Sequence, residues 1–309
     1  MIKVDLITGF LGSGKTTFLK RYARWLLDRG LRIGILENDY GAVNVDMLLL
    51  RELEGERCGL EMVAGACDAD CHRRRFKTKL IALAMGGYDR VLVEPSGVFD
   101  VDEFFDTLYE EPLDTRFEIG SVIAVVDANL EDGLSADADY LLASQLADAG
   151  TVLLSKTQLS TAEEREATVR HMDQALRAVK CGKEVRSRVL DKDWEQLSDS
   201  DFARIMNSGT DNHSFVKRGT TDDTDFRSLY FMNRPYTAAT LREKAERAFA
   251  DGRIGRIFRV KGFVREGGGW LEINATRQGT QISPVEVGQE IVIVIGEAMD
   301  TGAVEALFA

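Results

Sequence analysis

Gly9 to Thr16 read G-F-L-G-S-G-K-T and match the pattern G-x-x-x-x-G-K-[ST]. The motif follows an apolar, β-branched run at Ile2–Thr8 and precedes an amphipathic segment at Thr16–Asp28. Gly12 and Gly14 let the backbone curl so that successive N–H groups point at phosphate oxygens. The positive end of the following helix adds to this attraction. The stretch therefore predicts a strand, a loop and a helix that together bind a nucleoside triphosphate.

The side chains of this loop have separate expected roles. Lys15 is expected to reach the β- and γ-phosphates, and the Thr16 hydroxyl to take a position on Mg²⁺. A chance match in a glycine turn is the alternative, and the agreement of strand, motif and helix argues against it. The predicted phosphate-binding residues are Gly9, Gly12, Ser13, Gly14, Lys15, Thr16 and Thr17.

Apolar runs alternate with helical patterns over the first half of the chain. Continuous apolar runs suit strands that are buried on both faces, and strand–helix alternation implies right-handed βαβ units. We therefore predict an α/β fold: a P-loop NTPase domain with a mostly parallel, doubly wound sheet and its ligand at the carboxyl ends of the strands. The further predicted strands are Arg32–Leu36, Arg90–Glu94, Ser121–Asp127 and Thr151–Ser155, and a further helix is Cys71–Met85.

The composition changes near Leu197, and 309 residues are long for a single core. Residues 198–225 are rich in Asp, Ser, Thr, Gly and Asn, which is typical of a linker. We predict a P-loop domain at 1–197, a linker at 198–225 and a smaller α+β domain at 226–309. Its predicted strands are Phe226–Met232, Arg256–Val264, Trp270–Ala275 and Glu290–Ile295, and its predicted helix is Thr240–Ala250.

Charge and hydropathy exclude several classes of function. The net charge of -12 argues against general binding of nucleic acid, and no apolar stretch is long enough to span a membrane. The N-terminus lacks the layout of a signal peptide, so a cytoplasmic location is expected. The four cysteines then suggest thiols or metal ligands instead of disulfides. A local basic run most simply forms a solvated helix face: Arg73, Arg74, Arg75, Lys77 and Lys79.

A second motif, V-L-V-E-P-S-G, runs from Val91 to Gly97. It is an apolar strand that ends in a carboxylate, with a glycine three residues later. Glu94 is expected to bind Mg²⁺, directly or through water. The Gly97 N–H is expected to meet the γ-phosphate and to move when that group leaves. The alternative is a strand that merely ends in an acid.

The sequence S-K-T-Q closes the predicted strand Thr151–Ser155 and stands where a guanine-reading N-K-x-D motif would stand. Ser155, Lys156 and Gln158 are the predicted base-binding residues. An aspartate would accept two hydrogen bonds from guanine, whereas Gln158 offers one carbonyl acceptor and an NH₂ donor. GTP is therefore favoured, with ATP as the alternative. Asp127 is most simply a strand-end acid.

At these residues the chain resembles the CobW family of P-loop GTPases, which are metallochaperones. L-E-N-D-Y-G-A-V-N-V-D at Leu36–Asp46 is similar to the family's switch segment. F-R-V-K-G-F-V-R from Phe258 and I-V-I-V-I-G from Ile291 are similar to its C-terminal domain. The resemblance implies GTP hydrolysis coupled to delivery of Zn, Co or Ni to a client metalloprotein or a metallocofactor-assembly protein. It also implies that Glu37 and Asp39 face the nucleotide and the metal.

The chain departs from this family at its metal loop. The family carries C-x-C-C, whereas residues Gly65 to His72 read G-A-C-D-A-D-C-H. Cys67 and Cys71 remain, with Asp68, Asp70 and His72 near them and Glu37 across the loop. Two thiolates with carboxylate or imidazole ligands can form a tetrahedral Zn²⁺ or Co²⁺ site, for which Glu37, Cys67 and Cys71 are the predicted ligands. A site with fewer thiolates is expected to hold metal more weakly. The alternative is that both cysteines are inert.

Three functions remain open on the sequence. In the first, a nucleotide-driven metallochaperone, Lys15 and Gly97 act on the phosphates, and Asp39 orients the attacking water. The second is a small-molecule kinase with the Arg73–Arg75 run as its lid. The third is a nucleotide-dependent scaffold or sensor in which the metal loop is inactive and the second domain binds a partner protein.

Overall fold

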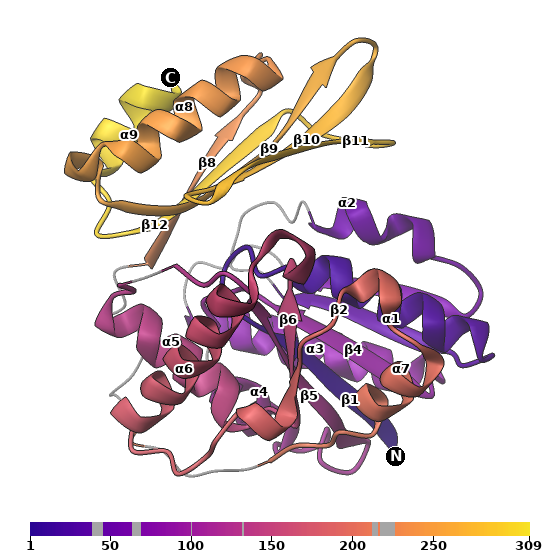
Figure 1. Ribbon diagram of the computed structural model, residues 1–309. Helices are drawn as coiled ribbons and strands as arrows, with labels where there is room; N and C mark the ends of the chain where they lie inside the picture. The colour runs from indigo at the N-terminus through magenta and orange to yellow at the C-terminus, as the bar shows by residue number, and fades with distance from the viewer. Residues whose placement is uncertain (39–45, 64–68, 100, 132, 212–215, 217–225) are drawn as a thin grey trace. The chain divides into compact units, whose positions relative to one another are not determined.

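The structure, a computed structural model, describes the chain except residues 39–45, 64–68, 100, 132, 212–215 and 217–225 (Figure 1). The chain divides into two compact units, Met1–Gly219 and Thr220–Ala309, and each is described below by itself.

The first unit alternates strands and helices along the chain. Its strands are β1 (Ile2–Thr8), β2 (Ile33–Asn38), β3 (Cys58–Val63), β4 (Arg90–Pro95), β5 (Phe117–Asp127), β6 (Thr151–Ser155) and β7 (Val189–Leu190). Its helices are α1 (Lys15–Asp28), α2 (Asp46–Leu50), α3 (Ala69–Met85), α4 (Val101–Leu108), α5 (Ala136–Ala147), α6 (Ala162–Ala178) and α7 (Asp199–Met206).

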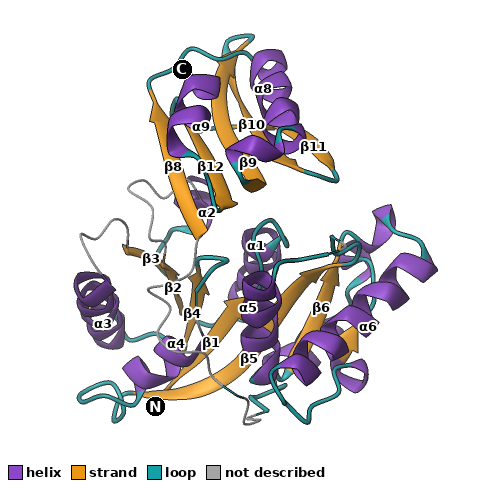
Figure 2. Cartoon of the chain, turned by 90° about the vertical axis from the view of Figure 1, so that its left-hand side faces the viewer, coloured by secondary structure: helices purple, strands orange, loops and turns teal. Residues whose placement is uncertain are grey.

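Within the described residues, the seven strands form one sheet in the order β3-β2-β4-β1-β5-β6-β7, and every strand pair is parallel. Helices flank the sheet in Figure 2. Side chains of α1 and α7 share one apolar core with one face of the sheet, and side chains of α3 to α6 share another with the opposite face. The predicted α/β fold with a doubly wound parallel sheet is confirmed, and it places the carboxyl ends of β1, β2 and β4 together.

A buried polar network anchors β1 just before the phosphate loop. The Asp5 carboxylate accepts hydrogen bonds from Arg90 Nη1 at 2.6 Å, from Tyr22 Oη at 2.8 Å and from the Ser121 N–H at 2.8 Å. These partners belong to β4, α1 and β5. A buried carboxylate is tolerated when it is paired and hydrogen-bonded in this way. The network therefore ties β1 to the elements that carry the rest of the site.

The segment predicted as a linker begins instead with helix α7. Ser198 caps this helix by accepting a hydrogen bond from the Asp201 N–H, and the Asp201 side chain accepts in return from the Ser198 N–H. Phe202 and Ile205 are buried in the core that contains α1. Polar residues that suggested a linker are therefore the cap of an amphipathic helix.

The second unit has its own sheet and core. Within its described residues, five strands pair antiparallel in the order β11-β10-β9-β12-β8. Helices α8 and α9 contribute Leu241, Val304 and Phe308 to one apolar cluster with this sheet. The predicted smaller α+β domain is confirmed. Its elements are β8 (Phe226–Met232), α8 (Ala238–Ala250), β9 (Arg256–Glu266), β10 (Gly269–Thr276), β11 (Gly279–Val285), β12 (Ile291–Glu297) and α9 (Thr301–Phe308).

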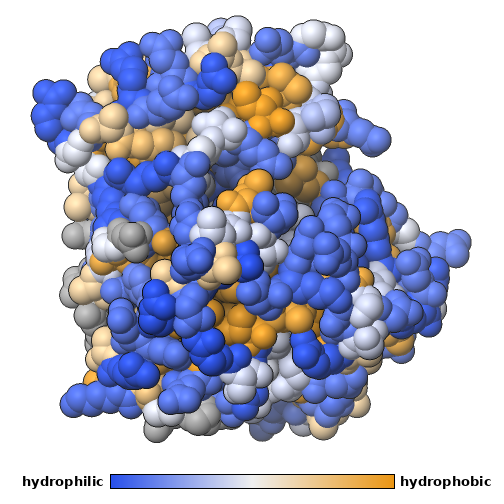
Figure 3. Space-filling view, in the orientation of Figure 1, coloured by the Kyte–Doolittle hydropathy of each residue, from blue (hydrophilic) through white to orange (hydrophobic). Residues whose placement is uncertain are grey.

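The surface in Figure 3 is coloured mainly as hydrophilic, with small hydrophobic areas between. The basic run on α3 is compensated locally, because Arg73 and Lys77 both form ion pairs with Glu110, and Lys79 forms one with Glu61. These pairs fit the interpretation of a solvated helix face. Among the helices that the structure describes, none is long and apolar enough to cross a bilayer.

Candidate nucleotide-binding site

The loop between β1 and α1 has the backbone that its glycines predict. Gly9, Gly12 and Gly14 have φ angles of 147°, 75° and 97°. L-residues with side chains rarely adopt these values, so glycine is required to turn the chain here. Gly14 caps α1 in the left-handed conformation, and the helix begins at Lys15. The first N–H groups of α1 therefore face the loop, as in a phosphate-binding cradle.

Gly9 also lies very close to β5, the strand that pairs with β1 in the sheet. A β-carbon at Gly9 would lie 2.2 Å from the carbonyl oxygen of Val125 on β5 and 2.8 Å from Ser13 Oγ. Neither contact is sterically allowed, because real β-carbons essentially never approach other atoms within 3.0 Å. The loop therefore packs flat against the carboxyl end of the sheet.

Three side chains with predicted phosphate and Mg²⁺ roles converge below the loop. The Thr16 hydroxyl donates to Glu94 Oε1 at 2.8 Å, so the two predicted Mg²⁺ ligands are in direct contact. Lys15 Nζ donates to the Gly9 carbonyl at 2.9 Å and is 7% exposed. The Lys15 ammonium is therefore buried and held on its own loop.

Two buried hydroxyls fit an anionic ligand. Ser13 Oγ and Ser155 Oγ are buried and make no hydrogen bond to any residue in the described part of the chain. Ser13 belongs to the loop and Ser155 ends β6, beside Gly14. Buried hydroxyls are normally hydrogen-bonded, so donors left over at this place fit a ligand rich in acceptor oxygens.

The candidate switch carboxylate lies beside the predicted Mg²⁺ carboxylate. Glu37 on β2 is in register with Glu94 on β4, and neighbours in register on parallel strands point to the same face. Both are buried, at 3% and 4% exposure. The structure therefore brings Glu37 next to Glu94, one of the predicted Mg²⁺ ligands. Asp39, the predicted water-orienting residue, lies outside the described residues.

Gly97 lies against the phosphate loop. A β-carbon at Gly97 would be 2.8 Å from the backbone nitrogen of Leu11, so only glycine fits here. The Gly97 carbonyl accepts a hydrogen bond at 3.1 Å from Gln145 Nε2 on α5. Gln145 had no role in the sequence-based site, because a lone glutamine within a helical pattern gives no indication of its partner.

The predicted base-binding residues follow β6. Lys156 has a φ of 56°, and its ammonium donates to Asp127 Oδ2 at 2.5 Å. Asp127 ends the neighbouring strand β5, so the structure joins this strand-end acid to the candidate base reader. Gln158 is exposed. The pair Lys156–Asp127 fixes the lysine stem along this edge of the sheet.

Trp194 is a neighbour of the site that the sequence pattern did not indicate. Its ring lies 3.4 Å from the position of a β-carbon at Gly14 and packs edge-on against Phe18, with ring centroids 5.6 Å apart. It follows β7 in a polar stretch of chain. The only sequence feature that could have predicted this position was a single tryptophan among Asp, Lys and Glu residues. An aromatic residue in such a segment most simply packs against the core, so it did not indicate a site.

The candidate transition-metal residues are only partly within the described chain. Cys67 lies outside it. Cys71 is half-buried near the start of α3. The next residue, His72, is fully buried with Nε2 2.6 Å from Asn38 Oδ1 at the end of β2. Burial, together with the nearby Arg75, lowers the pKa of His72 to about 4. His72 therefore links α3 to β2.

The described residues alone do not assemble a metal centre. Among them, no three His, Cys, Asp or Glu side chains form a group that could hold a metal ion. The predicted ligand set of Glu37, Cys67 and Cys71 includes one residue beyond the described chain, so this set stays a prediction.

Comparison with known proteins gives consistent matches. The sequence model described as CobW/HypB/UreG, nucleotide-binding domain, matches residues 3–186. The zinc chaperone YjiA of Escherichia coli is 30% identical over 172 residues, which are 53% of this chain and 52% of that protein. The zinc-regulated GTPase metalloprotein activator 1 of Dictyostelium discoideum is 25% identical over 309 aligned residues, which are 85% of this chain and 62% of that protein.

A crystal structure of Zn(II)-bound YjiA GTPase from E. coli aligns with 99% of this chain and 98% of its own, at 17% identity and a TM-score of 0.38. The chain spans about half the length of the first curated relatives that it matches.

Proposed function

We propose, because the chain belongs to the CobW/HypB/UreG family of nucleotide-binding domains, that it is a GTP-hydrolysing metallochaperone. In this proposal the nucleotide state controls delivery of a transition metal ion to a client metalloprotein or a metallocofactor-assembly protein. The proposal is supported above all by the convergence of Lys15, Thr16 and Glu94 at a glycine loop that fits a polyphosphate.

The hydrolytic part of the proposal uses the chain's own groups. The loop N–H groups and the first turn of α1 bind the phosphates, and Lys15 moves from the Gly9 carbonyl to the β- and γ-phosphate oxygens. Thr16 and Glu94 would hold Mg²⁺, which would supply positive charge against the phosphates when bound. Asp39 orients the attacking water, and Gly97 donates its N–H to the γ-phosphate. Loss of that phosphate then releases Gly97.

The metal part of the proposal rests on the position of Glu37 beside Glu94. Glu37 is the register neighbour of Glu94, so a metal ion on Glu37 would sense the charge at the Mg²⁺ site. Glu37, Cys67 and Cys71 together offer a carboxylate and two thiolates, a donor set that suits Zn²⁺ or Co²⁺. The names of the curated relatives favour Zn²⁺ as the first metal to test.

The base is proposed to be guanine. Lys156, fixed by Asp127, would lie along the base plane, and Ser155 and Gln158 would supply polar contacts. Trp194 closes the neighbouring side of Gly14.

Calorimetric titration tests the proposal directly. The protein is titrated with Zn²⁺, Co²⁺ and Ni²⁺, each in the presence of GDP and of a non-hydrolysable GTP analogue. We expect Zn²⁺ affinity to differ between the two nucleotide states by roughly tenfold, as for a coupling free energy of about 1.4 kcal/mol. Equal affinities would reject the coupling.

Three variants separate the two sites in this assay. Lys15→Ala is expected to abolish nucleotide binding and hydrolysis. The double substitution Cys67→Ser and Cys71→Ser is expected to weaken metal binding while nucleotide binding persists. Cys181→Ser is the matched control, because Cys181 is a buried thiol near the end of α6 that has no proposed role in either site. Metal binding that is identical in the double variant would exclude the two cysteines as ligands, whereas a parent protein that binds none of the three metals would favour the scaffold or sensor function.

A further inference from the structure

Gln145 on α5 presents a buried carboxamide to the candidate switch glycine. The side chain is 1% exposed, and its Nε2 donates to the Gly97 carbonyl at 3.1 Å. This hydrogen bond fixes the orientation of the amide, because the carbonyl of Gly97 requires a donor. A helix that carries no phosphate-binding residue therefore holds the residue proposed to sense the γ-phosphate.

The other end of the same amide is unused. Gln145 Oε1 is buried and accepts no hydrogen bond from any residue in the ranges that the structure describes. Most buried polar atoms of folded proteins have a partner, so an acceptor left over beside a switch residue points to a second arrangement in which it is used. A carboxamide suits two arrangements, since it carries a donor and an acceptor on one side chain.

Gly97 is confined between this amide and the phosphate loop. On one side lies the backbone nitrogen of Leu11, 2.8 Å from where a β-carbon of Gly97 would be. On the other side its carbonyl is held by Gln145. Movement of Gly97 toward a phosphate therefore changes its contact with Gln145 directly, with no intervening side chain.

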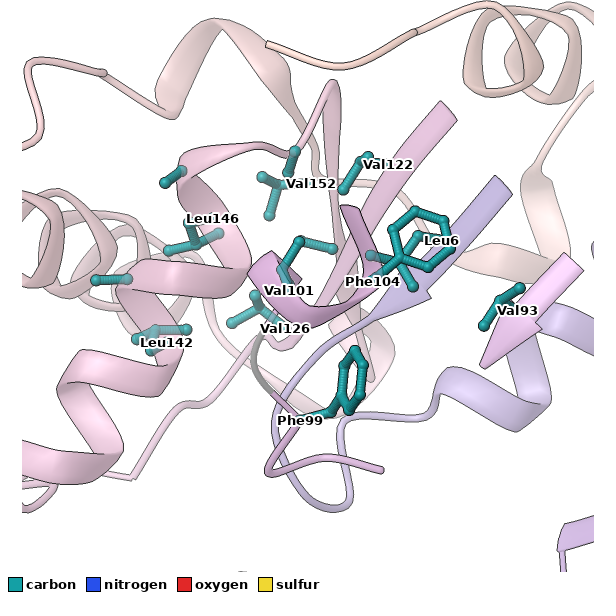
Figure 4. Packing of buried hydrophobic residues seen from close by; sticks show 14 of the residues in the cluster. Leu6, Val93, Phe99, Val101, Phe104, Val122, Val126, Leu142, Leu146 and Val152 are labelled. Atoms are coloured by element: carbon teal, nitrogen blue, oxygen red, sulfur yellow. The ribbon is translucent and has the colours of Figure 1, made fainter. Parts of the chain in front are cut away.

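Helix α5 is packed against the segment that follows Gly97. Figure 4 shows Leu142 and Leu146 of α5 near Val101, the first residue of α4, and Val126 on β5. Phe99 belongs to the same buried cluster. A close-packed core transmits a shift of the segment that follows Gly97 to α5.

The carboxyl end of α5 is in turn bonded to the segment that leads on toward the second unit. The Asp148 carbonyl accepts from the Asp211 N–H at 3.1 Å and from Thr210 Oγ1 at 2.9 Å. Ala149 pairs with Thr210 in an antiparallel bridge. Gln145 is three residues before Asp148, less than one turn of helix away. One short element thus joins Gly97 to the last described residues before 212–215.

We propose that Gln145 is a positioning residue that exchanges hydrogen-bond partners with the nucleotide state and moves α5 with it. With a diphosphate, Gln145 Nε2 holds the Gly97 carbonyl. With a triphosphate, the Gly97 N–H turns to the γ-phosphate, the Gly97–Val98 peptide rotates, and its N–H is accepted by Gln145 Oε1. The end of α5 passes this change to Thr210 and Asp211. This inference rests on the proposed nucleotide switch.

Hydrogen exchange on the unmodified chain is the first test. Amide exchange is followed by mass spectrometry with GDP and with a non-hydrolysable GTP analogue, each at saturation as measured by calorimetry. We expect exchange over residues 145–151 and 208–211 to differ between the two states by at least about threefold, within the usual range of coupling between sites. Equal exchange in these segments, with both nucleotides bound, overturns the inference and leaves the proposed function standing. If neither nucleotide binds, the proposed function itself fails.

The second test replaces the amide by an isostere. Gln145→Met keeps the length and bulk of the side chain and removes both hydrogen-bonding atoms. We expect the kcat for GTP hydrolysis to fall about tenfold, the value of one lost hydrogen bond in the transition state, while KM stays within about twofold. The exchange difference at 208–211 should disappear.

Ser144→Ala is the matched control on the same helix. Ser144 is 1% exposed, and its hydroxyl donates to the Leu141 carbonyl within α5, away from Gly97. It should keep the parent's kcat and exchange difference. If Ser144→Ala and Gln145→Met lose activity alike, or if Gln145→Met keeps both readouts, Gln145 has only a packing role and the inference is wrong.

Discussion

Gly97 lies so close to the phosphate loop that a β-carbon would not fit between them. The nearest atom to that position is the Leu11 nitrogen of the phosphate loop, at 2.8 Å. Gly97→Ala must therefore push the loop or the switch segment by several tenths of an ångström. Because phosphoryl transfer depends on positioning, we expect single-turnover GTP hydrolysis to slow by about 10²-fold.

Gly182→Ala is the control for this substitution, since no atom lies within 4 Å of a β-carbon at Gly182. It should hydrolyse GTP at the parent rate. A Gly97→Ala protein with the parent's rate would mean that the switch segment lies elsewhere in the active state.

Gln158 is the residue at which we expect base selectivity to change. It is exposed, and it follows the lysine that Asp127 fixes. Gln158→Asp supplies a carboxylate that can accept both the N1–H and the 2-amino group of guanine, whereas adenine has no such donor pair. We expect the ratio of GTP to ATP affinity to rise by about tenfold, measured by competition with a fluorescent nucleotide.

The carboxamide variant Gln158→Asn serves as the control, because it shortens the side chain in the same way without adding charge. It should not raise the ratio. A ratio that is unchanged by Gln158→Asp would remove the S-K-T-Q segment from the base site.

At the scale of elements, most strands were predicted from runs dominated by apolar and β-branched residues. β1 and β6 are observed at their predicted limits, Ile2–Thr8 and Thr151–Ser155. Of the described edge strands, β8 was predicted at its observed limits, whereas β3, β7 and β11 were not; β7 is only Val189–Leu190, and β3 and β11 carry polar residues such as Glu61 and Gln281. An edge strand has one paired neighbour and an exposed side, so its apolar pattern is weaker.

The site could be predicted as far as its motifs extend. Lys15, Thr16 and Glu94 belong to motifs with a fixed spacing, and the fold brings them together. Gln145 and Trp194 reach the same place from α5 and from the chain after β7. Their positions depend on how helices pack across the sheet, which no local spacing encodes.

Lys183 stabilises the end of α5. Its ammonium is buried and donates to the carbonyls of Leu146, Ala147 and Ala149 at 2.9, 3.2 and 2.6 Å. The Leu146 carbonyl also accepts from the backbone N–H groups of Asp148 and Ala149, and Lys183 adds a charged donor to the carbonyls at this C-terminus. Lys183→Met keeps the stem and removes the donors. We expect it to lower the free energy of unfolding by about 2 kcal/mol at pH 7, measured by urea denaturation.

The same lysine gives a pH dependence with a defined sign. Burial lowers the pKa of Lys183 to about 8, although Asp211 at 3.6 Å and Asp148 oppose the shift, while Arg188 adds to it. Between pH 8 and the unfolded-state value of 10.5, the unfolded chain holds a proton that the native chain has lost. The stability difference between parent and Lys183→Met should therefore widen as pH rises from 8 to 10, by up to about 3 kcal/mol.

Lys180→Met is the control, because Lys180 is exposed on the same stretch of chain. It should leave stability and its pH dependence unchanged. If the difference in free energy of unfolding between the parent and Lys183→Met stays constant from pH 8 to 10, Lys183 has the same pKa in the folded and the unfolded chain, and the prediction is wrong.

For the whole molecule, the two units have separate apolar cores. The clusters of the first unit contain residues up to Met206, and the cluster of the second begins at Leu229. Among the described residues, each unit also has a separate sheet, and no strand of one sheet pairs with a strand of the other. Since cooperative unfolding follows a shared core, we expect two transitions in scanning calorimetry.

Nucleotide binding should then raise the Tm of one transition and leave the Tm of the other unchanged. GDP with Mg²⁺ at 100 times its Kd adds about 2.7 kcal/mol to the unit that binds it, which raises the Tm of a unit of this size by roughly 5–10 °C. We expect this shift for the transition of the unit Met1–Gly219, and Lys15→Ala should abolish it. A single transition that moves as a whole with GDP would contradict the independence of the two cores. If the two cores unfold separately, the core of the second unit keeps its own stability when nucleotide binds. A nucleotide-dependent change in hydrogen exchange at residues 208–211 then belongs to the first unit alone.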